Sequence, residues 1–163
     1  MRLVEVVTRV LQENSIFKEL TPGQRELVAG CASLMVFQEG AFIYREGQPA
    51  QHFYLIRHGR VALEVHVPGR APIIVDSLRD GDPLGWSWLI PPYRTHFDAR
   101  ALGLTRVMGF DAECLRQKME ENPAFGYALH KRMAPVIASR LAAARRQLID
   151  IYGRPDQQGV AWR

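Results

Sequence analysis

The sequence predicts an α+β protein, in which an antiparallel β-roll of the jelly-roll-like, double-stranded β-helix type lies between N-terminal helices and a long C-terminal helix. Gly40, Gly47 and Gly59 separate short β-branched and aromatic runs, and a tightly wound antiparallel roll turns its corners at such glycines. Apolar residues recur at helical spacing near both ends of the chain. The 163 residues are enough for one domain with its own core, which we place at residues 1–152.

Two helices are expected within residues 1–33. The first is indicated by apolar residues at helical spacing, namely Val4, Val7, Val10 and Leu11. Before the second, the run from Thr21 to Gln24 supplies a capping residue, a proline at the first helical position and a glutamine at the capping-box position.

The roll is expected over residues 34–110, where short apolar runs are cut by glycine, proline and aspartate. The clearest strand patterns are residues 61–67, 73–75 and 106–110. Together these runs predict roughly eight strands, as in jelly rolls.

Two further helices are expected over residues 111–152. Asp111 is placed to cap a helix from Ala112 to Glu121, and Asn122 and Pro123 open a second helix that extends to about Tyr152. Pro135 should kink or restart this last helix. Residues 153–163 have the composition of a tail.

The last helix carries an apolar stripe whose members step by four, three, four and three residues. These residues, which we call the α-helical seam, are Ile137, Leu141, Ala144, Leu148 and Ile151. Such spacing over two heptads is typical of a coiled coil and predicts a parallel homodimer. The alternative is that the stripe packs back onto the roll, as an amphipathic helix does.

Composition excludes several classes of protein. The chain shows no signal peptide and no apolar run of ~20 residues, so we expect a cytoplasmic protein without membrane association. Cys31 and Cys114 lie far apart in sequence without metal-ligand or redox spacing, so we expect free buried thiols. We find no motif for nucleophilic catalysis, phosphate-loop binding or metal ligation, and we expect neither a catalytic nor a metal site.

Basic residues gather in a stretch that contains no acidic side chain between Asn122 and Ile149. They are Lys131, Arg132, Arg140, Arg145 and Arg146. Such a bias could suit a nucleic acid or an acidic partner, but no aromatic or glycine interleaving accompanies it. We therefore interpret the stretch as a solvated helix face.

The segments from Gly40 to Gly47 and from His52 to Val61 resemble the cyclic-nucleotide-binding-domain family, which includes catabolite activators, kinase regulatory subunits and gated channels. The resemblance implies a bacterial-type, Crp/Fnr-like sensory domain rather than an enzyme. It also implies dimerisation through the last helix. Catabolite activators carry a helix-turn-helix domain after that helix, but only about a dozen residues follow Ile151 here, so we expect no DNA binding from this chain.

Residues 85–101 are similar in length to the family's phosphate-binding cassette but differ in chemistry. In the family, a Gly-Glu pair opens the cassette, the Glu accepts the ribose 2′-hydroxyl, and an Arg nine residues later pairs with the phosphate. Here Trp86 takes the Glu position and Thr95 the Arg position. Tryptophan has no acceptor and threonine has no charge. Losing two hydrogen bonds to charged groups would weaken a family-like complex by ~10²- to 10⁴-fold.

The candidate binding residues are those of the cassette, namely Gly85, Trp86, Ser87, Trp88, Tyr93, Arg94, Thr95 and His96. Arg94 could replace the missing clamp, and Ser87 could offer a hydroxyl to the ribose. A surviving pocket would be an aromatic box that includes Phe97, whereas the alternative is that the aromatic rings simply fill the cavity. We expect Arg100 to pair with Asp98 or to face solvent.

Three functions follow from these observations. The first is a non-catalytic regulatory or sensor module with an altered pocket, which binds an unidentified small molecule and signals through a dimer helix to a partner protein. The second is a true receptor for cyclic AMP or cyclic GMP that uses Arg94. The third is a structural or interaction domain with a plugged pocket. No cofactor is expected other than a cyclic nucleotide.

Overall fold

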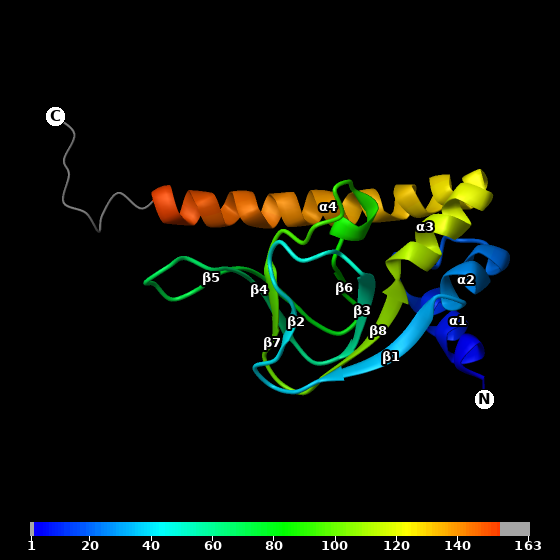
Figure 1. The fold of residues 1–163 in the computed structure, drawn as a ribbon, viewed down its shortest axis with the longest axis horizontal. Helices are drawn as coiled ribbons and strands as arrows, with labels where there is room; N and C mark the ends of the chain where they lie inside the picture. Colours follow the sequence, from blue (N-terminus) through cyan, green and yellow to red (C-terminus); the bar gives the residue numbers. More distant parts are fainter. Residues whose placement is uncertain (1, 154–163) are drawn as a thin grey trace.

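Antiparallel strands in two facing sheets form the centre of the protein (Figure 1). The structure is a computed structural model that describes residues 2–153, and within this range it has eight strands. One sheet has the order β1-β8-β3-β6, formed by Ala32–Phe37, Thr105–Asp111, His52–His58 and Pro83–Leu84. The other has the order β2-β7-β4-β5, formed by Phe42–Tyr44, Asp98–Ala101, Val61–Val65 and Ile73–Leu78. The predicted β-roll is confirmed.

The glycines that predict the roll do lie at its corners. Gly40, Gly47 and Gly59 have φ values of 83°, 81° and 118°, which side chains other than glycine rarely adopt. Gly59 is also crowded, because a Cβ atom there would lie 2.8 Å from the Cα atom of Thr105. Glycine is therefore required at this corner for both conformation and space.

Four helices flank the roll within the described residues: α1 (Leu3–Glu13), α2 (Pro22–Ala29), α3 (Ala112–Glu121) and α4 (Pro123–Tyr152). The capping box between Thr21 and Gln24 is present, and Asp111 and Asn122 cap α3 and α4 through their side chains. The helix boundaries predicted for the C-terminal half are confirmed.

Of the two outcomes predicted for Pro135, a kink or a restart of the last helix, the restart is wrong. Helix α4 is assigned as one element from Pro123 to Tyr152 with Pro135 inside it. Pro135 is exposed, while Met133 and Val136 on either side of it are buried in the core. Packing of these flanking residues holds the helix together across the missing hydrogen bond.

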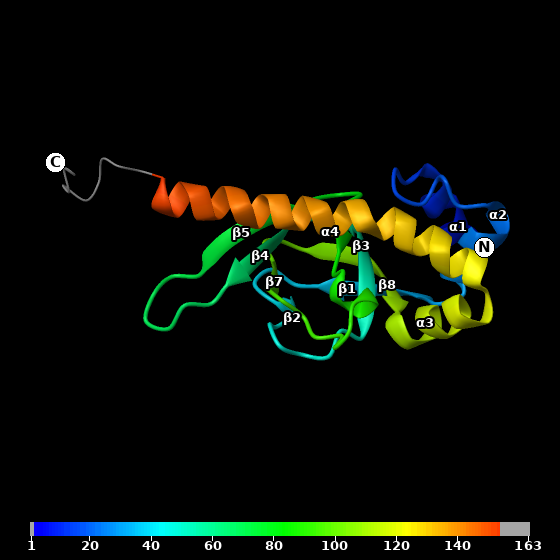
Figure 2. The same cartoon turned by 90° about the horizontal axis from the view of Figure 1, so that it is seen from above.

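The buried residues form two cores. A helical core joins all four helices to one end of the roll, and Phe53 lies in it with ring centroids 5.7 Å from both Phe17 and Phe110. A roll core lies between the sheets and consists of Ile43, Tyr54, Ile56, Val61, Leu63, Leu78, Leu84, Ala99 and Val107. Helices α1, α2 and α3 gather at one end of the roll, and α4 runs from there along it (Figures 1 and 2).

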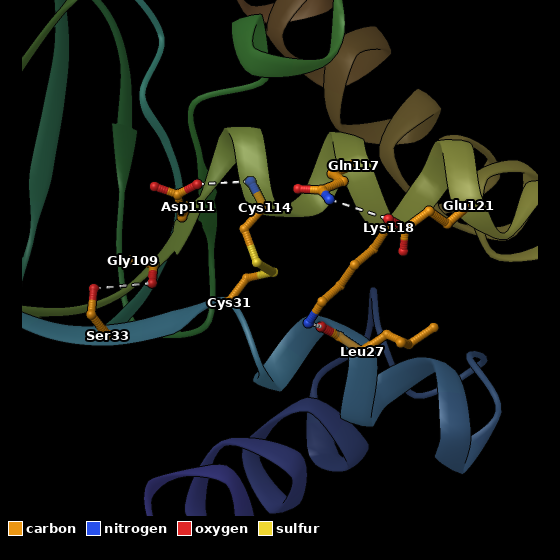
Figure 3. Close-up of a disulfide and its surroundings, with 9 residues drawn as sticks. All are labelled: Leu27, Cys31, Ser33, Gly109, Asp111, Cys114, Gln117, Lys118 and Glu121. Atoms are coloured by element: carbon orange, nitrogen blue, oxygen red, sulfur yellow. Dashed lines mark hydrogen bonds between the residues drawn. A yellow bond between two sulfur atoms is a disulfide. The ribbon is translucent and has the colours of Figure 1, made fainter.

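The cysteine prediction is also wrong. Cys31 and Cys114 form a disulfide with a Cα–Cα distance of 5.8 Å (Figure 3). Sequence separation hid this pairing, because strand pairing places the start of β1 beside the end of β8, where α3 begins. The thiol groups are therefore bonded and not free.

Three predictions concern features beyond the roll itself. Within residues 2–153, no helix combines the length and the apolar character needed to cross a membrane. A cytoplasmic location stays a prediction. Of the predicted tail, residues 154–163 lie outside the described residues.

Candidate functional site

The cassette of residues 85–101 follows β6, begins at a glycine corner and includes strand β7 at its end. Gly85 has a φ of 84°, which turns the chain from β6 into the short 3₁₀ helix η1 (Ser87–Leu89). The loop then passes through Pro91 and Pro92 to Tyr93, a non-glycine residue with a φ of 60°. The cassette thus begins at a glycine corner and passes through a tightly constrained loop before it enters β7.

Three of the predicted residues come together where the two arms of the cassette meet. The rings of Trp86 and His96 stack with centroids 4.6 Å apart and planes 23° apart. The Oγ of Ser87, a buried residue, lies 3.1 Å from Nδ1 of His96. Trp86, Ser87 and His96, which we call the cassette cluster, therefore contact one another, and the side-chain oxygen of Ser87 is already engaged.

Thr95, which the sequence comparison predicts at the position of the family's phosphate-binding arginine, is buried. Its hydroxyl donates to the carbonyl of Arg45, and it accepts from the backbone N–H of Gln48 at 3.1 Å. The backbone of Thr95 adds a hydrogen bond to the Gln48 carbonyl at 2.9 Å and accepts one from Gly47. Thr95 thus ties the cassette to the turn after β2, and its neutral side chain offers no pairing to an anion.

Arg94, predicted as an alternative clamp, lies apart from the cassette cluster. It is exposed and donates to the carbonyl of Gly47 at 3.3 Å. It lines a surface cavity of about 500 Å³ between the turn after β2 and the start of α3. His52 and Arg116 also line this cavity. The structure therefore does not bring Arg94 to the cassette cluster.

The predicted aromatic box is not formed as a unit. Trp88 is fully buried in the helical core, 6.2 Å from Phe53 between ring centroids, and its indole N–H has no partner within the described part of the chain. Tyr93 lies under the guanidinium of Arg116, 4.2 Å from Cζ to the ring centroid. Phe97 packs against the roll core. The aromatic residues thus divide between two cores and the surface.

Buried charges on the second sheet are paired in a way that the sequence did not predict. Arg100 binds Glu64, which is 1% exposed, and not Asp98. Its Nε donates to Glu64 Oε1 at 3.0 Å, and this hydrogen bond raises the pKa of Arg100. Asp98 instead pairs with Arg45 at 3.4 Å. Glu64 and Asp98 stand opposite each other in the β4–β7 register, so each carboxylate needs its own cation.

Helix α4 carries a buried charged residue, Arg140. Arg140 is 8% exposed and donates to the Pro83 carbonyl at 2.6 Å and to Asp76 Oδ2 at 3.4 Å. Burial raises the pKa of the Tyr44 phenol, and the positive charge of Arg140 offsets part of that rise. Arg140 also lines a polar cavity of about 340 Å³ with Arg146. The interpretation of Arg140 as part of a solvated basic face is wrong.

Sequence periodicity contains a signal that could have located Arg140. The face of α4 that packs on the core steps by four, three, four and three residues through Leu129, Met133, Val136, Arg140 and Ala143. Arg140 is the one charged member of this stripe. A charge at a core position of a helix needs a buried partner, and Asp76 with the Pro83 carbonyl provides it.

The α-helical seam lies on a different face of α4. Leu141, Leu148 and Ile151 are 71%, 56% and 50% exposed, and Ile137 and Ala144 are partly exposed. The alternative that this stripe packs back onto the roll is therefore wrong. The stripe through Arg140 does that, which leaves the seam facing outward.

Comparison with known proteins identifies the family. The family model described as "Cyclic nucleotide-binding domain" matches residues 34–122, more than half of the chain. The HTH-type transcriptional regulator Cmr of Mycobacterium tuberculosis (strain CDC 1551 / Oshkosh) is 26% identical over 143 residues, which cover 86% of this chain and 57% of that relative. The chain thus spans less than two thirds of the length of that relative.

Solved structures give the same result. A protein from Geobacter metallireducens GS-15, assigned as a cyclic nucleotide-binding protein, has a TM-score of 0.73 at 28% identity, covering 86% of this chain and 99% of that one. The sensor domain of the transcriptional regulator DNR from Pseudomonas aeruginosa has a TM-score of 0.67 at 18% identity, with coverage of 98% and 100%, and at this identity it shows the fold alone. The chain belongs to the cyclic nucleotide-binding domain family.

Proposed function

We propose that this chain is a non-catalytic regulatory module whose pocket no longer holds a cyclic nucleotide in the family's manner. The observation that carries the proposal is the arrangement of the cassette. Trp86 stacks on His96 where the ribose acceptor is expected, and Thr95 is bonded to the turn after β2 where the phosphate clamp is expected. Neither position supplies the charge that recognises a sugar phosphate.

The receptor alternative that uses Arg94 has little support. Arg94 would have to give up its hydrogen bond to Gly47 and leave the surface cavity that it lines with Arg116. Even then the ribose would have no acceptor, because the hydroxyl of Ser87 is hydrogen-bonded to His96.

Calorimetric titration with cyclic AMP and cyclic GMP at millimolar concentration tests this proposal. We expect no binding heat from the natural chain. The double variant Trp86→Glu/Thr95→Arg restores both family groups and should gain affinity by about 10²-fold or more, provided that circular dichroism shows it folded. Trp86→Phe is the matched control, because it changes the ring without adding an acceptor. Micromolar binding by the natural chain would refute the proposal.

The signal would leave the module through α4 in a parallel dimer. The exposed α-helical seam supports this arrangement, since a continuous apolar stripe on a long helix is stabilised by pairing with a second copy. Leu141→Asp should convert a dimer into a folded monomer in sedimentation velocity. Leu104→Asp, at an exposed leucine between β7 and β8, should leave the dimer intact. A natural chain that sediments as a monomer would exclude the dimer.

A melting screen separates a working sensor from a plugged scaffold. Small planar anions should raise the melting temperature of a sensor, because a ligand that binds only the folded state stabilises it. His96→Ala, which removes one ring of the cassette cluster, should abolish that rise. If no compound shifts the melting temperature, the interaction-domain alternative gains support.

A further inference from the structure

The disulfide joins two segments that otherwise meet through non-covalent contacts. Cys31 lies between α2 and β1, and Cys114 lies in the first turn of α3, 83 residues later (Figure 3). The backbone N–H of Asp111 donates to the carbonyl of Cys31 at 2.9 Å. Lys118, one turn after Cys114, donates to the carbonyl of Leu27 at 2.9 Å. These contacts would keep the segments together if the disulfide were reduced.

The two sulfur-bearing residues differ in accessibility and surroundings. Cys31 is 7% exposed, whereas Cys114 is partly exposed and packs against the helical core. The first turn of a helix stabilises a thiolate, while the carboxylates of Asp111 and Glu113 in and before that turn oppose it. Because Cys114 is the more exposed of the two residues, we expect an external thiol to reach its sulfur first.

The disulfide also lies close to the start of α4. Helix α3 ends at Glu121 and α4 begins at Pro123, so the two helices are separated by Asn122 alone. Gly126 of α4 packs so closely on α3 that a Cβ atom there would lie 3.1 Å from the Met119 carbonyl oxygen. A covalent link from α2 and β1 to α3 therefore restrains the start of α4 as well.

We propose that Cys31 and Cys114 form a reversible thiol–disulfide site that takes small thiols and disulfides, and that its oxidised state restrains α3 and the start of α4. A thiolate attacks Cys114 Sγ, which forms a mixed disulfide and releases the Cys31 thiolate. A second thiolate attacks the external sulfur of that mixed disulfide and releases the Cys114 thiolate. In sum, two molecules of reduced glutathione become one of oxidised glutathione, and the protein gains two thiols. This input is independent of what the cassette binds.

The first test asks whether the exchange occurs in the folded protein. The oxidised full chain is incubated with reduced glutathione without denaturant, alkylated and weighed by intact-mass spectrometry. We expect both cysteines to become alkylated, and we expect oxidised glutathione to reverse the reduction. A disulfide that resists reduction until denaturant is added would mean a purely structural role and would overturn the proposal.

The second test asks whether the redox state reaches α3 and α4. Amide hydrogen exchange in Ala112–Glu121 and the first turns of α4 should become about tenfold faster or more after reduction, while β4 and β7 stay unchanged. Cys31→Ser/Cys114→Ser should exchange like the reduced natural chain and ignore glutathione. Unchanged exchange in α3 after reduction would refute the restraint.

A single variant covers the case in which the double variant does not fold. Cys31→Ser keeps the accessible thiol, so oxidised glutathione should attach to Cys114 and add one glutathionyl group to the intact mass. Absence of this adduct in the folded variant would contradict the assignment of Cys114 as the reactive sulfur.

Discussion

Replacing Arg140 by methionine should destabilise the protein by about 3 kcal/mol. Methionine keeps most of the apolar stem of the side chain, so the change removes chiefly the guanidinium and its bonds to Pro83 and Asp76. A hydrogen bond involving a charged group contributes about 1.5–3 kcal/mol, and a buried carbonyl left without a donor costs about 1–3 kcal/mol. Asp76 is 25% exposed and so regains part of its hydration, which keeps the total near the lower end of the combined range of about 2.5–6 kcal/mol.

Urea unfolding followed by circular dichroism measures this free energy directly. For a chain of this length, a loss of about 3 kcal/mol corresponds to a melting temperature roughly 6–12 °C lower. Arg146→Met is the matched control, because Arg146 is an exposed arginine of the same helix that borders the same cavity. It should change stability by no more than about 0.5 kcal/mol.

A double-mutant cycle with Asp76→Asn separates the contribution of the Arg140–Asp76 ion pair from that of the hydrogen bond to Pro83. We expect a coupling free energy of about 1 kcal/mol between the two sites, since they are in direct contact. If Arg140→Met proves as stable as Arg146→Met, the view that Arg140 holds α4 on the roll is refuted.

Two further predictions concern the roll. Gly59→Ala should lower the free energy of unfolding in urea by about 2–4 kcal/mol, because residue 59 has a φ of 118° and the new Cβ would meet the backbone of Thr105. Gly69→Ala should lower it by only about 1–2 kcal/mol, because residue 69 has a φ of 74° but open space around it. Equal costs for the two variants would contradict the crowding at Gly59. Burial raises the pKa of Tyr44 and of Tyr54, so above the ordinary pKa of 10.0 the unfolded chain ionises first, and the free energy of unfolding falls as the pH rises toward the native pKa. Tyr44→Phe should reduce this alkaline slope in unfolding curves, and an unchanged slope would exclude Tyr44 as its source.

Much of the fold was predictable because its signals are local. The capping box at Thr21 and the caps at Asp111 and Asn122 depend on hydrogen bonds within three residues. Periodicity likewise separated the seam through Leu141 from loops and strands, although it could not say which stripe of α4 would face the roll.

The candidate site was predictable in position but not in arrangement. Gly85 begins the cassette at a corner after β6, whereas the assignment of Trp86 and Thr95 to the family's recognition positions stays a prediction. The direction of each side chain depends on neighbours far away in sequence. Thr95 bonds the turn after β2, and Trp88 enters the helical core beside Phe53.

The sequence by itself determined the helices, the glycine corners, the strands between them and the residue types of the cassette. These depend on backbone conformation and residue type, which act over a few neighbouring positions. Only the tertiary structure decided the disulfide between Cys31 and Cys114, the ion pair between Glu64 and Arg100, and the burial of Arg140 against Asp76. Each of these pairings joins residues at least 36 positions apart, and such contacts are set by the strand order and by the path of α4 over the roll, which no local pattern encodes.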